Sequence, residues 1–176
     1  MITAIQFRQV SLSAADMRTY LFGVFFVAGN VILPQLCHLV PDGGKIFLPI
    51  YFFTLIASYK FGLKVGLLTA VLSPLCNHLL FGMPPASVLP ILLIKSSLLA
   101  VAGAMVASRT KALSLLLLAV VVLAYQVVGG MAEWIITSEW SLAVQDFRIG
   151  FPGMLLQIGL GWMVLKVIAK YDVKKF

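Results

Sequence analysis

The sequence predicts an all-α integral membrane protein, a single domain with six transmembrane helices. Apolar residues make up 61% of the chain, well above the roughly 45–50% that is usual in a soluble domain. Charged residues make up only 11%, and they stand mainly at the edges of long apolar runs. The 176 residues are enough for five or six runs of about 20 residues, the length that crosses a bilayer.

The first half of the chain provides three of these spans. Residues 19–40 form the first, an apolar run without a charged residue. Residues 41–45 read Pro-Asp-Gly-Gly-Lys, a composition typical of a tight turn. The second span, 46–59, is short and aromatic, so it must pack against its neighbours or reach only part of the way across. The third, 65–80, contains Pro74, which is expected to make the local backbone irregular.

The second half provides the other three spans, which are expected at 88–108, 112–136 and 149–165. A Gly-Met-Pro-Pro turn at 82–85 precedes the first of them and reverses the chain. The most polar connection of the chain runs from 137 to 148.

The basic residues give the orientation, because Lys and Arg accumulate on the cytoplasmic side of a membrane protein. One set of helix ends holds Arg8, Arg18, Lys60, Lys64, Arg109, Lys111, Lys166, Lys170, Lys174 and Lys175. The opposite set holds only Lys45 and Arg148, and Lys95 lies inside a span. Both termini are therefore expected in the cytoplasm, and the loops after residues 40, 80 and 136 are expected to face outward.

Several classes of function are disfavoured. A net charge of +7 could suggest a nucleic-acid partner, but the basic residues flank apolar runs instead of forming one face or stripe. The chain has no phosphate-cradling loop that ends in Gly-Lys-Ser/Thr, no His-Glu-x-x-His zinc motif and no serine nucleophile elbow. We therefore expect neither nucleic-acid binding nor enzyme activity, and no resident cofactor.

Polar residues gather in the half of the spans that is expected to face outward. A charge at membrane depth costs at least about 2.5 kcal/mol unless it is paired or faces a polar cavity, so this gathering predicts a pocket for a polar small molecule. The residues expected to bind it are Lys95, Asn77, His78, Glu133, Trp134, Gln126, Gln35 and Arg148.

Some of these residues have a second interpretation. Lys95 favours a ligand with a carboxylate, phosphate or carbonyl group, but it could instead pair with Glu133 to neutralise two buried charges. Trp134 and Trp140 are either interfacial belt residues or aromatic walls for a ring-shaped ligand. Cys76 is either a small apolar filler of its helix or a metal ligand.

The stretch from Phe61 to Ala100 resembles the S components of energy-coupling factor (ECF) vitamin transporters. The similar pieces are Phe-Gly-Leu-Lys-Val-Gly at 61–66, Ser73-Pro74, Gly-Met-Pro-Pro at 82–85 and Leu89-Pro90. The resemblance implies a six-span protein of a bacterial or archaeal cytoplasmic membrane. Such a protein binds a vitamin beneath its outer loops, and a module of one membrane scaffold subunit and two ATPases drives its release inside.

The chain departs from the family in its first span. S components often carry an Ala-x-x-x-Ala stripe there, whereas Gly23, Ala28 and Gly29 do not fall at that spacing. A solitary transporter that works without the ECF module is therefore the alternative. Some cobalamin-transporting S components are solitary and meet cobalt through a cysteine near this loop, so the resemblance implies a corrinoid substrate with Cys76 as the cobalt ligand.

Other substrates and other functions stay open. Metal-free vitamins are the alternative substrates, namely pantothenate, pyridoxine, a thiamin precursor or riboflavin. An intramembrane hydrolase built on His78 and Glu133 is a further alternative, although no nucleophile lies near a base in the sequence. A purely structural membrane subunit would not explain why the polar residues gather on one side.

Overall fold

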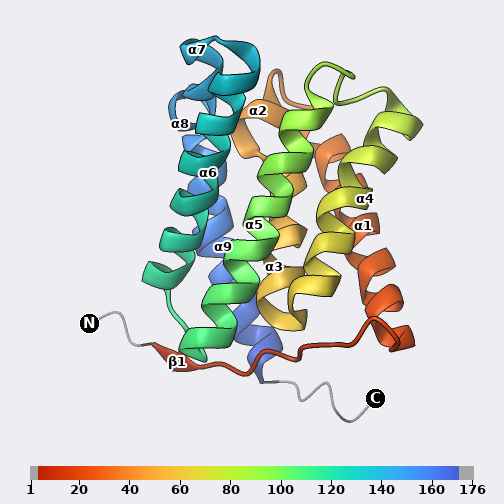
Figure 1. Ribbon diagram of the computed structural model, residues 1–176, viewed down its shortest axis with the longest axis vertical. Coiled ribbons are helices and arrows are strands. Elements are labelled where there is room, and N and C mark those ends of the chain that lie inside the picture. The colour runs from red at the N-terminus through yellow and green to blue at the C-terminus, as the bar shows by residue number, and fades with distance from the viewer. Residues whose placement is uncertain (1–3, 171–176) are drawn as a thin grey trace.

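The computed structural model describes residues 4–170, which fold into a helical bundle (Figure 1). The helices are α1 (Met17–Cys37), α2 (Gly43–Phe47), α3 (Phe52–Phe61), α4 (Leu63–Phe81), α5 (Leu89–Thr110), α6 (Leu115–Thr137), α7 (Trp140–Ala143), α8 (Gln145–Arg148) and α9 (Phe151–Ala169), with a 3-10 turn η1 (Pro49–Tyr51) before α3. Among the described residues, five helices are long and apolar enough to cross a membrane: α1, α4, α5, α6 and α9. The protein is thus a multi-pass, all-α membrane protein.

The second span predicted from the sequence is not one helix. Residues 46–59 are divided among α2, η1 and α3, and the break lies at Leu48 and Pro49. Leu48 has a left-handed backbone (φ 47°), and the proline after it has no N–H to continue a helix. Every residue from Thr54 to Phe61 is buried, so α3 packs against its neighbours, as its shortness led us to expect.

Pro74 does not interrupt its helix, and the predicted irregularity is wrong. Helix α4 runs without a break from Leu63 to Phe81. Its buried segment around the proline is held by α1, where the side chain of Asn30 donates to the Ser73 hydroxyl at 3.2 Å. A bond from the neighbouring helix thus holds the chain beside the proline, and α4 continues through it.

Counted together with the short α3, the helices α1, α3, α4, α5, α6 and α9 run alternately up and down, so the bundle has two different ends (Figure 1). The α7 end consists of residues 38–51, 82–88 and 138–150. The β1 end carries a two-stranded antiparallel sheet, in which β1 (Ile5–Gln6) pairs with β2 (Ala112–Leu113). Between the ends, α3 lies at the centre of the apolar core, where Leu55, Tyr59 and Leu99 are buried.

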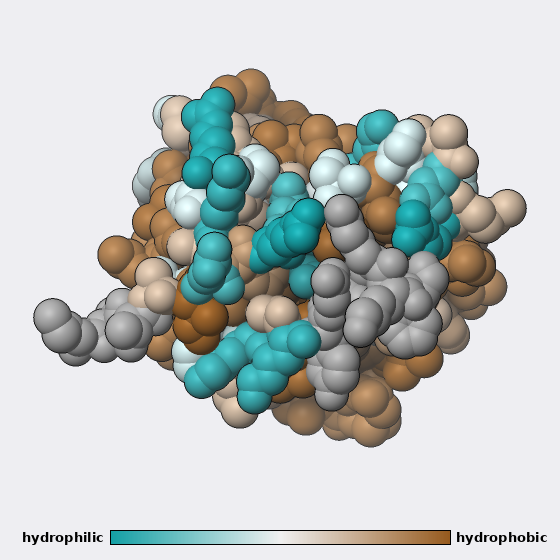
Figure 2. Space-filling model, turned by 90° about the horizontal axis from the view of Figure 1, so that it is seen from below, coloured by the Kyte–Doolittle hydropathy of each residue, from teal (hydrophilic) through white to brown (hydrophobic). Residues whose placement is uncertain are grey.

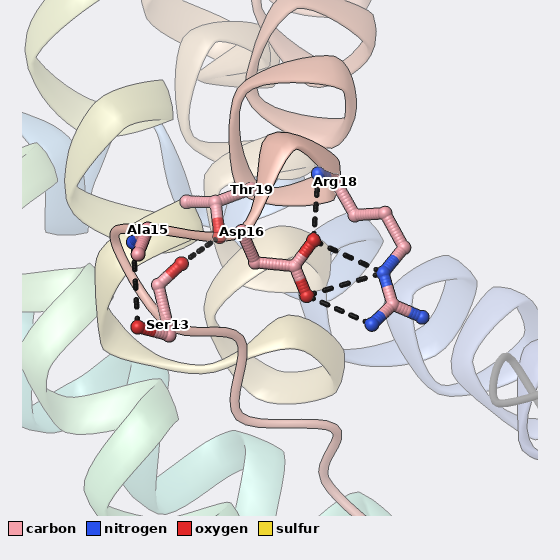
Figure 3. A network of polar contacts seen from close by, with 5 residues as sticks. All are labelled: Ser13, Ala15, Asp16, Arg18 and Thr19. Carbon is pink, nitrogen blue, oxygen red and sulfur yellow. Dashed lines mark hydrogen bonds and ion pairs between the residues drawn. The ribbon is translucent and has the colours of Figure 1, made fainter.

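The β1 end is closed by the segment that precedes α1. The amide nitrogen of Gln9 lies 3.0, 3.3 and 3.2 Å from the carbonyl oxygens of Ser58, Tyr59 and Ala104, and so it caps α3. Asp16 caps α1 by accepting from the backbone N–H of Arg18 and from its guanidinium (Figure 3). The helix ends here have the partners that exposed backbone groups need.

Hydrophilic side chains cover the β1 end (Figure 2). The exposed basic residues among them are Arg8, Lys64, Arg109, Lys111, Lys166 and Lys170. These residues belong to the set that the sequence assigned to the cytoplasm, and Lys174 and Lys175 of that set lie outside the described residues. One face of the bundle is therefore basic, as the positions of the charges along the chain predicted.

Candidate functional site

Three charged side chains from three segments meet near the α7 end. Lys95 lies in the second turn of α5, and its Nζ is 2.6 Å from Glu133 Oε2 on α6 and 2.8 Å from Asp146 Oδ2 on α8. The exposed fractions of these side chains are 4% for Lys95, 14% for Glu133 and 15% for Asp146. We call these three residues the ion cluster. From the sequence, the pairing of Lys95 with Glu133 was one of two interpretations. In the structure the two residues are paired, and Asp146 is a second carboxylate partner of Lys95.

Two glycines of α6 make this arrangement possible. A Cβ atom on Gly129 would lie 2.6 Å from Cγ of Lys95, so the lysine stem crosses α6 where there is no side chain. The ammonium group can then reach Glu133, which lies one helical turn beyond Gly129. A Cβ atom on Gly130 would lie 2.9 Å from the carbonyl oxygen of Ala143, so the same helix also admits α7 at close range.

The ion cluster has one positive and two negative groups, which gives a net charge of −1 when all three are ionised. Removing Lys95 alone would leave two carboxylates close together and poorly solvated, which is strongly unfavourable. A ligand anion would have to displace Glu133 or Asp146 from the ammonium group. Lys95 in the sequence suggested an anionic ligand, but in the structure such a ligand would compete with Glu133 and Asp146 for the ammonium group.

A second buried group of polar side chains lies next to the ion cluster. The Tyr125 hydroxyl donates to Gln157 Oε1 of α9 and accepts from Gln126 Nε2, both at 3.0 Å. We call these three residues the amide–tyrosine cluster. The Tyr125 ring packs on Tyr51 with 5.2 Å between centroids. Gln126 lies one helical turn before Gly129, where the Lys95 stem crosses α6. The two clusters thus belong to one polar region between η1, α5, α6, α8 and α9.

Gln35 and Asn77 belong to a different network, between α1, α3 and α4. Their side chains approach each other at 3.4 Å, and Asn77 also donates to the backbone carbonyls of Asn30 and Ser73, both at 2.9 Å. Asn30 in turn donates to the Thr54 hydroxyl at 3.1 Å. These bonds join helices to one another, which is the common role of polar side chains between membrane helices.

His78 and Cys76 do not share a face of α4. The His78 Nδ1 atom lies 2.7 Å from the Pro84 carbonyl oxygen, so this nitrogen carries a proton and fastens the loop between α4 and α5. Residues two positions apart in a regular helix point in directions that differ by about 200° around its axis. The half-buried side chain of Cys76 therefore points away from that of His78. Within residues 4–170, His, Cys, Asp and Glu form no group of three or more that could hold a metal ion.

The remaining predicted residues lie at the surface of the α7 end. Trp134 is 48% exposed and Trp140 is 64% exposed, and their rings contact each other edge to face at 5.7 Å between centroids. This exposure fits the belt interpretation better than a pocket wall. Arg148 is also exposed, at the end of α8. Of the eight expected binding residues, Lys95, Glu133 and Gln126 thus lie in the polar region, and the other five lie elsewhere.

Four residues of the polar region were not among the expected ones: Tyr51, Tyr125, Asp146 and Gln157. Gln157 had a recognisable signal, because it is a strongly polar side chain in the middle of the last apolar run. Asp146 had none, since its loop is polar throughout and only the folded arrangement brings it to Lys95.

Comparisons with known proteins give no match to a protein-family model, a curated protein or a solved structure. The structure shows what two glycines of the stretch from Phe61 to Ala100 do. Gly62 (φ 86°) and Gly82 (φ 65°) take backbone conformations that favour glycine, at the start and end of α4. They set where this helix begins and stops.

Proposed function

We propose that the protein captures a vitamin-sized polar molecule at the α7 end and carries it across a bacterial or archaeal cytoplasmic membrane, as ECF S components do. The observation that carries this proposal is the ion cluster, which is built from three segments and buried at the end opposite the basic face. Ionisable groups within a membrane bundle are costly, and they usually mark a pathway or a binding site.

The proposed topology has six membrane segments, with both termini in the cytoplasm. The basic β1 end faces the cytoplasm, and the α7 end faces outward. Five segments are the long helices, and the short buried α3 is the remaining one, preceded by α2 and η1. In this orientation the ion cluster lies just beneath the outer surface, where a captured molecule would arrive.

The two glycines of α1 favour a solitary transporter over one that docks on an ECF module. A Cβ atom on Gly23 would lie 3.5 Å from the Leu68 side chain, and one on Gly29 would lie 2.8 Å from the Phe53 ring. Both glycines therefore face into the bundle, where they are unavailable to a scaffold subunit. Pairing with a scaffold and two ATPases is the alternative, which co-purification with such a module would reveal.

The side chains of the polar region suit a metal-free vitamin, because hydroxyl, amide, ammonium and carboxylate groups recognise ligands by hydrogen bonds. A corrinoid is the second candidate, supported by the half-buried free thiol of Cys76 near the end of α4. Thiolate is a strong ligand for a transition metal and a hydroxyl is a poor one. A corrinoid substrate predicts cobalt absorption bands that shift with wild-type protein and not with Cys76→Ser.

The proposal is tested by titrating the detergent-solubilised full-length protein with cyanocobalamin, riboflavin, pantothenate, pyridoxine and the pyrimidine precursor of thiamin. We expect one of them to bind, and we expect the neutral triple variant Lys95→Met/Glu133→Gln/Asp146→Asn to bind it at least about tenfold more weakly. Glu139→Gln changes an exposed carboxylate at the same end and serves as the matched control. Failure of all five to bind, with no small molecule co-purifying by mass spectrometry, would contradict the proposal.

A further inference from the structure

The amide–tyrosine cluster contains hydrogen-bonding atoms that the fold itself does not use. Tyr125, Gln126 and Gln157 are each 1% exposed. Although both glutamines bond to the Tyr125 hydroxyl, Gln126 Oε1 and Gln157 Nε2 have no partner in the part of the chain that the structure describes. One unused acceptor and one unused amide donor therefore flank the same tyrosine.

This result does not depend on how the two amide groups are oriented. A hydroxyl donates one hydrogen bond, so Tyr125 donates to one glutamine and accepts from the other. If both amides are turned over, the unused atoms become Gln126 Nε2 and Gln157 Oε1. Either orientation leaves one carbonyl oxygen and one amide nitrogen without a partner.

Two buried atoms without hydrogen-bond partners are energetically unfavourable in the ligand-free protein. A buried polar group without a hydrogen bond carries the full cost of its desolvation, whereas apolar residues of the same shape would carry none. The same holds for the hydroxyl of Ser96, which follows Lys95 in α5 and is also buried without a partner among the described residues. A group that arrives from outside and bonds to these atoms would remove the cost.

The cluster lies where a molecule entering at the α7 end would arrive. One face of α6 carries, at intervals of one helical turn, Gln126, the Gly129–Gly130 pair and Glu133. Gln126 therefore lies two turns further from the α7 end than the Glu133 carboxylate. Asp146 bonds to Lys95 from α8, a short helix that belongs to the α7 end (Figure 1).

We propose that Gln126, Tyr125 and Gln157 bind the polar edge of the transported molecule, an edge that has an N–H donor beside an acceptor. Primary amides, cyclic imides and aminopyrimidines have this edge. The inference rests on the proposed function, and it names the substrate class. The ion cluster then closes the site from outside through Asp146.

The test uses the full-length protein and the same panel. Riboflavin, cyanocobalamin and the thiamin precursor carry a nitrogen donor beside an acceptor on one edge. Pyridoxine has no N–H group, and the trans amide of pantothenate points its N–H and C=O in opposite directions. The variant Tyr125→Phe/Gln126→Met/Gln157→Met removes the polar atoms and nearly preserves the volume. We expect it to unfold without ligand at or above the temperature of wild type, and to bind the donor–acceptor probe at least about tenfold more weakly.

Gln9→Met is the matched control, because it removes a glutamine at the opposite end of the bundle and should leave probe binding unchanged. If the triple variant does not fold, Gln126→Met alone removes one of the unused atoms and should still weaken binding. A variant that binds the probe as tightly as wild type overturns the inference and leaves internal water as the partner of the glutamines. Binding of pyridoxine or pantothenate alone overturns the inference but keeps the proposed function. Binding of no probe, with no small molecule co-purifying, overturns the proposed function itself.

Discussion

The two ends of the bundle use polar side chains in opposite ways. At the β1 end the charges are mostly exposed, and the polar groups that close the helices have partners: Gln9 reaches three carbonyl oxygens, and Asp16 bonds to Arg18. At the α7 end an ion cluster is buried, and two glutamine atoms next to it lack partners in the described chain. Satisfied polar groups at the surface stabilise a fold, whereas buried groups left unsatisfied are typical of a site that binds something else.

The sharpest way to break this comparison is to show that the ends are not on opposite sides of the membrane. Single cysteines at Asp42, Ser87 and Ser141, introduced into a protein without Cys37 and Cys76, should react with an impermeant reagent in intact cells. A cysteine at Thr110 in the β1 end should react only after permeabilisation. Labelling that requires permeabilisation at two of the three outer positions would overturn the orientation.

The largest energetic effect is expected from Lys95→Met. Removing the ammonium leaves Glu133 and Asp146 facing each other, and we expect the free energy of unfolding to fall by about 3 kcal/mol, as for other buried pairs that lose one partner. Lys45→Met is the control, since Lys45 pairs with Asp42 at the surface with a side chain that is 60% exposed. Unfolding in mixed micelles measures both, and equal stability of the two variants would show that the ion cluster contributes little.

The neutral triple variant of the ion cluster sharpens this result. Replacing all three charges removes the unpaired carboxylates, so most of the stability that Lys95→Met loses should return. Ligand binding should not return with it. Recovery of both would mean that the charges serve neither stability nor binding.

A smaller effect is expected at the β1 end from Gln9→Met. The substitution removes a donor shared by three backbone carbonyls and should lower the free energy of unfolding by about 1 kcal/mol. Ligand binding should be unchanged, because Gln9 is at the other end of the bundle. Loss of binding in this variant would show that the two ends are coupled and not separate in function.

The smallest effect concerns the cap of α1. The hydrogen bonds from Arg18 lower the pKa of the Asp16 carboxyl group. The ionised carboxylate therefore stabilises the folded protein at pH values above the unfolded pKa of about 3.9, and this contribution is lost as the pH falls through the lower folded value. The melting temperatures of wild type and Asp16→Asn should differ slightly at pH 6 and converge at low pH, and a difference that grows on acidification would contradict the assignment.

Hydrophobic patterning predicted the long helices well, because each apolar run is bounded by charges or turn residues. Residues 65–80 and 88–108, for example, became α4 (Leu63–Phe81) and α5 (Leu89–Thr110). The second span failed because Leu48 and Pro49 break it, and a left-handed leucine has no signature in the sequence. Lys95 and Glu133 could be paired by their depth alone, but Asp146 depends on how α8 folds back over α6, which no local pattern encodes.

The most direct test of the central claim is native mass spectrometry of the full-length protein purified from cells grown in rich medium. The α7 end is proposed to bind a small molecule, so wild type and Gln9→Met should carry the same additional mass. The neutral triple variant of Lys95, Glu133 and Asp146 should carry none. An identical bound mass in all three proteins, or none in any of them, would contradict a binding site at the ion cluster.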